Sequence, residues 1–446
     1  MRPGRSRSRF GAHVNFVSTR TRAIAVGIDA ALIAGLAPDG GLYVPERIPT
    51  LAATAVHGDL ASTALSVLAP YFADSALRER LGELCTRAFA FPAPLRPMLG
   101  AGDWVLELFH GPTAAFKDYA ARFLVEALAA LRPSVAAPTT IVVATSGDTG
   151  AAVASAFHRR AGFNVAILYP DGRVSPRQAH GLGCWGDNVR AFRVAGSFDD
   201  CQSLAKQALT DEDLRRTMPL SSANSISLGR LLPQVAYYAH AATQFFATHG
   251  MPLNFIVPTG NLGNACAALL GKRMGLPIGE LVLATNANDV LLRYFAGNAY
   301  APQASRATLA NAMDVGAPSN FERLRYWHQS DAELRGALSA HSVDDGVIAQ
   351  TIRVAEQRHG IVPCPHTATA LRVLEYLRTA GDARPFAIVA TAHPAKFETI
   401  VEPLVGHRVE PPMALAQCLA RPAFAEDLPA DYQVLRTRLL ESMAHW

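Results

Sequence analysis

The stretch Thr140–Phe157 reads TIVVATSGDTGAAVASAF and combines a strand, a turn and a helix. Its β-branched run predicts a buried strand, its Ser-Gly-Asp-Thr centre predicts a tight turn, and its alanines predict a helix. The same order recurs in VPTGNLGNACAALLG (Val257–Gly271), where an apolar strand meets a glycine-rich turn and an Ala-rich helix. Strands that alternate with helices form parallel sheets covered on both faces, so these stretches predict an α/β fold.

The alternation continues outward in both directions, from about residue 95 to the late strand-like run FAIVAT, residues 386–391. It is interrupted once, by MPLSSANSISLGR at 218–230. We therefore expect two lobes of parallel or mixed sheet covered by helices, together with an N-terminal subdomain. The predicted divisions are a disordered Arg-rich extension, the N-terminal subdomain, the two lobes and a C-terminal tail: 1–13, 14–95, 96–220, 221–405 and 406–446.

Composition excludes several classes of function. The 446 residues are 50% hydrophobic and 17% charged, with a net charge of +4. No apolar run approaches the roughly 18 residues of a membrane span. The sequence also lacks a long basic face, which argues against nucleic-acid binding. The six cysteines are scattered without a CxxC pair, a spacing that fits neither a zinc site nor a disulfide framework. We expect a cytoplasmic protein with reduced thiols, no metal and a small-molecule partner.

Three segments have the composition of anion-binding turns. Glycines in Thr145–Gly150 and Gly260–Asn264 allow backbone N–H groups to approach an anion at a helix N-terminus. Ser221–Arg230 adds hydroxyls, an amide and Arg230, a residue type suited to bidentate phosphate contacts. Taken alone, each segment also fits an ordinary turn, a capped helix or a polar interlobe loop. Gly181–Gly186 (GLGCWG) matches the dinucleotide fingerprint, but the strand follows it instead of preceding it, which argues against that site.

Lysine is rare in this chain, and its rarity draws attention to LFHGPTAAFKDYAARF. Only four of the 41 basic residues are lysines: Lys117, Lys206, Lys272 and Lys396. Three anion sites without a Walker loop suggest a phosphorylated cofactor and an anionic substrate, and pyridoxal phosphate also requires a primary amine, which arginine cannot supply. Lys117 lies among apolar residues that would lower its pKa. Lys396 follows a strand end and is the only rival for this role.

The motifs together resemble the threonine synthase family, whose members depend on pyridoxal phosphate and have the tryptophan synthase β-like fold (fold type II). Those that carry the resemblance occur in this order: DAALIAGLAPDGGLYVPERIP, LFHGPTAAFKDYAARF, ATSGDTGAAVASAF, SFDDCQSLAKQAL, SSANSISLGRLLPQVAYY, PTGNLGNACAALLGKRMGLPI, AMDVGAPSNFERL, CPHTATAL and TAHPAKF. The resemblance covers about residues 14–405, and the first motif looks like that family's own N-terminal subdomain. One departure is Thr21, which stands where the family has glycine.

The resemblance implies a role for each matching residue. Lys117 matches the lysine that forms the imine with the cofactor, and Thr391 matches the hydroxyl partner of the pyridine nitrogen. The loop expected at the cofactor phosphate comprises Gly260, Asn261, Leu262, Gly263 and Asn264. The loop expected at the substrate carboxylate comprises Ser146, Gly147, Asp148 and Thr149. Residues expected near the substrate phosphate are Asn224, Ser225 and Arg230, with Ser319, Asn320 and Arg323.

The implied reaction converts O-phospho-L-homoserine and water into L-threonine and phosphate, the last step of threonine biosynthesis. Lys117 would act as the general base and proton shuttle. Related lyases such as serine dehydratase or cysteine synthase are disfavoured by Ser221–Arg230 and by the N-terminal subdomain. A phospho-amino-acid lyase that stops after elimination remains open, as does a non-catalytic homologue. We expect a monomer or a homodimer.

Overall fold

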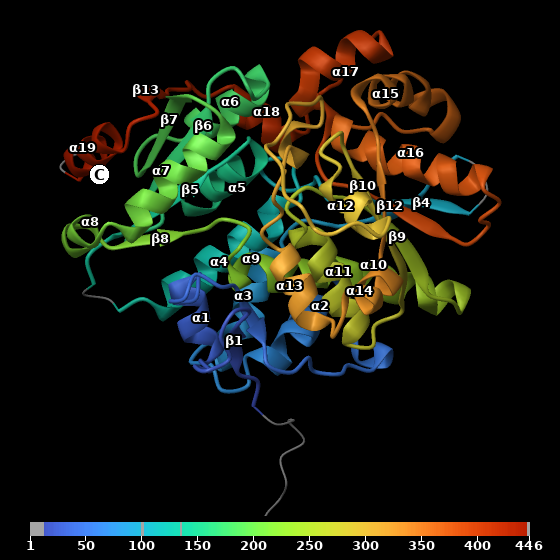
Figure 1. The fold of residues 1–446 in the computed structure, drawn as a ribbon, viewed down its shortest axis with the longest axis horizontal. Helices are drawn as coiled ribbons and strands as arrows, with labels where there is room; N and C mark the ends of the chain where they lie inside the picture. Colours follow the sequence, from blue (N-terminus) through green and yellow to red (C-terminus); the bar gives the residue numbers. More distant parts are fainter. Residues whose placement is uncertain (1–12, 100–101, 134–135, 444–446) are drawn as a thin grey trace, which may run out of the picture.

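A computed structural model of the protein describes residues 13–99, 102–133 and 136–443. Two large sheets, each covered by helices on both faces, form its body (Figure 1). This architecture confirms the predicted α/β fold with parallel and mixed sheets. Of the extension predicted for 1–13, all but His13 lies outside the described residues.

The first sheet has five strands, all parallel, in the order β13-β7-β6-β5-β8. Its strands are β5 (Thr139–Ala144), β6 (Phe163–Pro170), β7 (Val189–Ala195), β8 (Leu220–Ser222) and β13 (Glu426–Pro429). Successive strand residues point to opposite faces and so enter two separate cores. One face packs under α4 (Lys117–Leu131), α5 (Asp148–Phe157) and α6 (Pro176–Gly183), and the other under α7 (Phe198–Thr210), α8 (Glu212–Thr217) and α19 (Tyr432–Ser442).

The second sheet has six strands in the order β11-β10-β9-β12-β4-β3, parallel except for the pair β3 and β4. Its strands are β3 (Leu95–Pro97), β4 (Asp103–Glu107), β9 (Leu253–Pro258), β10 (Ile278–Thr285), β11 (Ser339–Ser342) and β12 (Phe386–Ala390). One core contains α10 (Val235–His249), α11 (Gly263–Arg273), α12 (Val290–Phe295), α13 (Phe321–Trp327) and α14 (Asp331–Ala337). The other contains α15 (Asp345–His359), α16 (Pro365–Thr379), α17 (Glu398–Val405) and α18 (Met413–Leu419).

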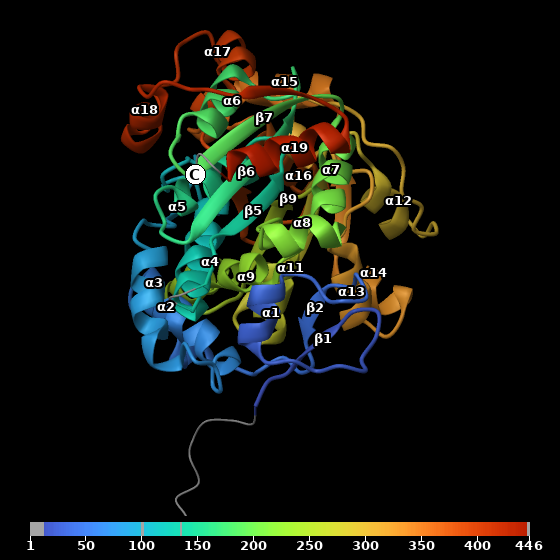
Figure 2. The same cartoon turned by 90° about the vertical axis from the view of Figure 1, so that its left-hand side faces the viewer.

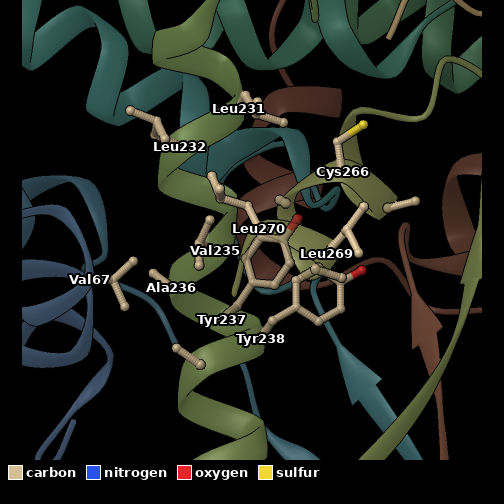
Figure 3. Packing of buried hydrophobic residues seen from close by; sticks show 14 of the residues in the cluster. Val67, Leu231, Leu232, Val235, Ala236, Tyr237, Tyr238, Cys266, Leu269 and Leu270 are labelled. Atoms are coloured by element: carbon tan, nitrogen blue, oxygen red, sulfur yellow. The ribbon is translucent and has the colours of Figure 1, made fainter. Parts of the chain in front are cut away.

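The N-terminal region packs against this second lobe. Its elements are β1 (Phe16–Ser18), α1 (Ile28–Ala34), β2 (Tyr43–Pro45), α2 (Leu60–Leu68) and α3 (Leu81–Ala88). They lie together at one end of the molecule, below α4 and α9 (Leu228–Leu231) (Figures 1 and 2). Figure 3 shows Val67 of α2 facing Val235 and Ala236 of α10, with Leu269 and Leu270 of α11 beyond. The N-terminal region therefore shares one continuous apolar core with α10 and α11.

The strands do not follow the sequence divisions in two places. β4 lies within the predicted lobe 96–220, yet it pairs with β12 of the second lobe. β13 lies in the predicted C-terminal tail 406–446, yet it forms an edge of the first sheet beside β7. Parallel pairing joins strands through long crossovers, so neighbours in the sheet need not be neighbours in the sequence. The domain limits themselves stay predictions.

Local sequence explains where several helices begin. Ser175 and Ser197 start α6 and α7 with capping boxes, in which each serine accepts from a backbone N–H and the third helical residue reaches back. Asp59 caps α2 by accepting from Ser62. Across the described ranges, no helix is long and apolar enough to cross a membrane.

Candidate active site

The loop before α4 and the end of β12 hold Lys117 from both sides. The Phe116 N–H donates to the Thr391 carbonyl over 2.8 Å, and the His393 N–H donates to the Ala114 carbonyl over 3.0 Å. Ala114 adopts a left-handed conformation with φ 52°, which is unfavourable for an L-residue and is kept only where the surroundings enforce it. As a result, Lys117 is the first residue of α4 and lies beside the backbone of Thr391.

Asp118 fixes the turn that precedes this lysine. Its buried carboxylate accepts from the Thr113 N–H at 2.8 Å and from the Thr113 hydroxyl at 2.7 Å. A Cβ at Gly111 would lie 2.5 Å from the Asp118 Oδ2 atom, so this glycine permits the close approach. The turn HGPT and Asp118 thus set the direction in which α4 begins.

Lys117 has an amine that can lose its proton near neutral pH. Its side chain is partly accessible, but the dense protein around it removes enough water to lower its pKa to about 7. The nearby Arg230 guanidinium lowers this pKa further, and the Asp148 carboxylate opposes the shift. The exposed Lys206 experiences no comparable burial. A low amine pKa is a property of nucleophilic and proton-transferring lysines.

The turn between β9 and α11 presents a helix N-terminus to the same region. Leu262 precedes the helix with a left-handed φ of 62°, and a Cβ at Gly260 would lie 2.8 Å from the Met313 Cα atom. The Asn261 side chain donates to the Ser225 hydroxyl at 2.7 Å and accepts from the Ser319 N–H at 2.5 Å. This turn is therefore held in a strained shape by the two segments beside it.

Two buried tyrosines donate hydrogen bonds to the Asn264 side chain. Its Oδ1 atom accepts from the Tyr237 hydroxyl at 2.6 Å and from the Tyr238 hydroxyl at 2.9 Å, and Figure 3 shows both rings side by side on α10. Its buried Nδ2 atom has no hydrogen-bond partner within the described part of the chain. An unsatisfied buried donor at a helix N-terminus fits an anion.

The turn between β5 and α5 has a different chemistry. Gly147 precedes α5 with φ 126°, and the Thr145 hydroxyl accepts from the N–H groups of Gly147 and Gly150. Asp148, the first helical residue, is buried and forms an ion pair with Lys396, with 2.6 Å between Oδ1 and Nζ. Ser146 and Thr149, in contrast, stay partly accessible. The carboxylate of Asp148 is thus occupied within the protein.

The segment Asn224–Arg230 lies beside the α11 turn. Arg230 is fully buried and donates to the Ala223 carbonyl at 2.5 Å, and burial lowers its pKa to about 10. Its Nε atom has no partner among the described residues, nor do the Asn224 Oδ1 and Ser227 Oγ atoms. Several polar atoms of this segment therefore remain unsatisfied, and one of them belongs to Arg230, whose charge acts on Lys117.

Arg323, which the resemblance places near the substrate phosphate, has its guanidinium bonded to protein groups. Its guanidinium donates twice to the Tyr43 carbonyl, at 3.1 and 3.0 Å, and once to the Ile226 carbonyl at 2.7 Å. A further N–H group donates to the Asn320 side chain, which itself donates to the Asn261 carbonyl at 2.9 Å. These contacts make Arg323 a tie between β2, the Asn224–Arg230 segment and the α11 turn.

Sequence reasoning undervalued two residues of this region. Lys396 is 3% exposed and donates to the Thr113 carbonyl at 2.8 Å in addition to its ion pair with Asp148. His366 is buried, with its Nε2 atom accepting from the Ala312 N–H, and burial lowers its pKa to about 4. Both lie in motifs that carry the family resemblance, CPHTATAL and TAHPAKF, which was the available signal.

Thr21, the departure from the family motif, is accommodated at the surface. Its N–H and hydroxyl groups both donate to the Asp39 carboxylate. Next to it, Thr19 and Arg20 contact Glu322 of α13. The departure therefore leaves the residues around Lys117 untouched.

Comparisons with known proteins show which family this chain belongs to. Residues 92–394 match the family described as pyridoxal-phosphate dependent enzyme, residues 15–89 match threonine synthase N terminus, and residues 367–438 match threonine synthase, C-terminal. The threonine synthase of Escherichia coli (strain K12) is 38% identical over 419 residues, which cover 93% of this chain and 96% of that protein.

Two solved structures have the same fold. The crystal structure of threonine synthase from Escherichia coli has a TM-score of 0.89 at 36% identity and covers 97% of this chain and 100% of its own. The pyridoxal-phosphate-bound threonine synthase from Brucella melitensis has a TM-score of 0.87 at 34% identity, covering 96% of this chain and 99% of its own. The chain belongs to the threonine synthase family of pyridoxal-phosphate-dependent enzymes.

Proposed function

We propose that this chain converts O-phospho-L-homoserine and water into L-threonine and phosphate, by β,γ-elimination followed by β-addition of water. The observation that carries the proposal is the partly accessible Lys117 amine, with a pKa of about 7, beside the buried Arg230. The reaction needs a base that exchanges protons near neutral pH and a cation that attracts a phosphorylated substrate. Both occur here in one place.

The residues around Lys117 fit pyridoxal phosphate. Lys117 offers the primary amine, Thr391 lies beside it with its carbonyl bonded to the Phe116 N–H and would offer its hydroxyl to the ring nitrogen, and the α11 turn offers an N-terminal anion site. Its support is the unsatisfied Asn264 side-chain amide N–H at the N-terminus of α11. When bound, this cofactor supplies an electron sink next to the substrate amino group. Gly260 to Asn264 would then hold its phosphate.

We assign the proton transfers to the Nζ atom of Lys117. In its neutral form this atom accepts the proton from the substrate Cα, and as an ammonium it returns a proton later in the reaction. Because burial lowers the pKa of this amine to about 7, both its neutral and its protonated forms are accessible near neutral pH, which suits both directions. The backbone from which this side chain extends, at the first residue of α4, is fixed by the hydrogen bonds of Phe116 and Asp118.

Substrate contacts are proposed for two further segments. The amide end of α5 and the partly accessible hydroxyls of Ser146 and Thr149 would bind the substrate carboxylate, because the Asp148 side chain is already paired with Lys396. Asn224, Ser225 and Arg230 would bind its phosphate. Ser319 and Asn320 support this segment through Asn261.

The test is a simultaneous assay of phosphate release and threonine formation from O-phosphohomoserine. Equal rates of both products are expected. Phosphate and 2-oxobutyrate without threonine would indicate a lyase that stops after elimination. A colourless protein without turnover would indicate a non-catalytic homologue. A cytoplasmic location and a monomeric or homodimeric state stay predictions from the sequence.

A further inference from the structure

A buried lysine, Lys396, lies in the same region as Lys117 without a role in the proposed chemistry. It is 3% exposed, in the short turn Pro394–Phe397 that follows Thr391 and β12. Its ammonium pairs with Asp148 at 2.6 Å and donates to the Thr113 carbonyl at 2.8 Å. Burying such a pair costs a large desolvation free energy, so stability alone is a weak explanation for its presence.

The position of this ammonium is tightly fixed. The Lys396 carbonyl accepts from the Ser175 hydroxyl at 2.5 Å, and the preceding Ala395 carbonyl accepts from Arg177 at 2.7 Å. Both donors belong to the start of α6. Lys396 therefore joins the end of β12, the first residue of α5 and the loop before Lys117.

The charges around Asp148 give this connection a consequence. Asp148 is faced by the Lys396 ammonium, by the Lys117 amine, by His366 and by the neutral Gln178. His366 is uncharged at neutral pH, because burial lowers its pKa to about 4. Lys396 is thus the group that balances the Asp148 carboxylate while the Lys117 amine is neutral.

Without that balance, Asp148 would act on Lys117 itself. Its negative charge favours the protonated form of the Lys117 amine, which the Arg230 guanidinium disfavours. A carboxylate freed from Lys396 would attract a proton to Lys117, and it would also repel a substrate carboxylate at the amide end of α5. Both effects would hinder the proposed reaction.

We propose that Lys396 is a positioning residue, whose ammonium holds the Asp148 carboxylate and the first turn of α5 so that this carboxylate does not pair with the Lys117 amine. The proposal rests on the proposed function of Lys117 as a base. Lys396 itself touches neither reacting atoms nor cofactor in this scheme. It acts through Asp148, and its effect is on the proton affinity of Lys117.

The test compares the pH dependence of kcat in the holoenzyme for the wild type, Lys396→Met, Lys396→Arg and Lys396→Met/Asp148→Asn. The profile of kcat reports groups in the substrate complex. In Lys396→Met, the acidic limb is expected to move to higher pH by on the order of 1 unit, with an increased KM. Lys396→Arg keeps the positive charge, and its acidic limb is expected to stay at the wild-type pH. The double variant removes both charges and is expected to return the limb towards the wild type.

Other readouts separate this role from a purely structural one. The substrate's own groups titrate identically in every variant, so only differences between variants are compared. The visible spectrum of the substrate-free holoenzyme is titrated with pH in parallel. The midpoint pH of this titration is expected to move in the same direction as the acidic limb of kcat. Lys206→Met, which removes an exposed lysine on α7, is the matched control and is expected to leave the profile unchanged.

Several outcomes would overturn the proposal. One is that the acidic limb of the kcat profile of Lys396→Met stays at the wild-type pH. Another is that the acidic limb of the double variant stays displaced to higher pH. If Lys396→Met fails to fold, Asp148→Asn measures the same coupling, and its limb is expected at lower pH; an unmoved limb there would also refute the role. A wild type that makes no threonine rejects the proposed function instead, whereas the spectral titration still tests Lys396.

Discussion

The N-terminal ends of α5 and α11 look alike in sequence, since each follows a buried strand and a glycine-rich turn. In the folded protein they are held by opposite means. At α5 the first helical residue, Asp148, is a buried charge balanced by Lys396. At α11 the second helical residue, Asn264, is neutral and is held by two tyrosine hydroxyls. The comparison teaches that one local motif can be completed by either charges or neutral dipoles.

The largest expected effect is the loss of stability when the charged end is broken. Lys396→Met leaves the Asp148 carboxylate buried without its partner, which typically costs about 3–5 kcal/mol. Denaturant unfolding of the holoenzyme should show a fall of this size in the free energy of unfolding. A fall below about 1 kcal/mol, the size found for an exposed pair, would mean that the ion pair is more solvated than its burial indicates.

The glycines of the two turns are required for different reasons. Gly147 has a φ of 126° that L-residues rarely adopt, whereas Gly260 is required by space, because its Cβ would lie 2.8 Å from the Met313 backbone. We expect Gly260→Ala to cost about 1–3 kcal/mol through overpacking and to weaken cofactor binding, measured by equilibrium dialysis. Gly263→Ala is the comparison in the same turn, since its Cβ meets no atom closer than 3.7 Å, and its effect should be clearly smaller.

Disrupting the neutral N-terminal end of α11 should cost less stability than disrupting the charged N-terminal end of α5. Asn264→Ala removes the acceptor of two buried hydroxyls, and an unsatisfied buried group costs about 1–3 kcal/mol. Tyr237 retains an alternative contact with Gln234, so the loss should lie near the lower end. Tyr238→Phe removes only one bond and should cost about 1 kcal/mol. Thermal and denaturant unfolding measure both, and equal losses would show that Asn264 does not join the two tyrosines.

The last expected effect is on activity and not on stability: it is the pH dependence of the wild type. The pKa of Lys117 is lowered to about 7, and the proposed base is its neutral form. The value of kcat should therefore rise with pH through 7 and level off above it, and at pH 6 it should be roughly a tenth of the plateau. A kcat that is constant between pH 6 and 8 would show that the Lys117 proton does not limit the reaction.

The comparison also shows how far sequence reasoning reached. The fold class followed from periodicity, because alternating strand and helix patterns permit few architectures. The family followed from motifs in order, and the comparisons confirmed it. The role of Lys117 stays a prediction, with its low pKa as support. The strand order was not predictable, because β4 and β13 pair with partners far away in the sequence.

The sequence by itself determined the chemistry on offer, namely a primary amine, glycine turns at helix ends and an arginine suited to phosphate. Those properties belong to residue types and short spacings. The tertiary structure decided which charges are paired, and it joined Lys396 to Asp148 and Arg323 to Tyr43. These pairs lie 248 and 280 positions apart. Burial and Coulomb interactions depend on distances in space, which only the packed fold creates.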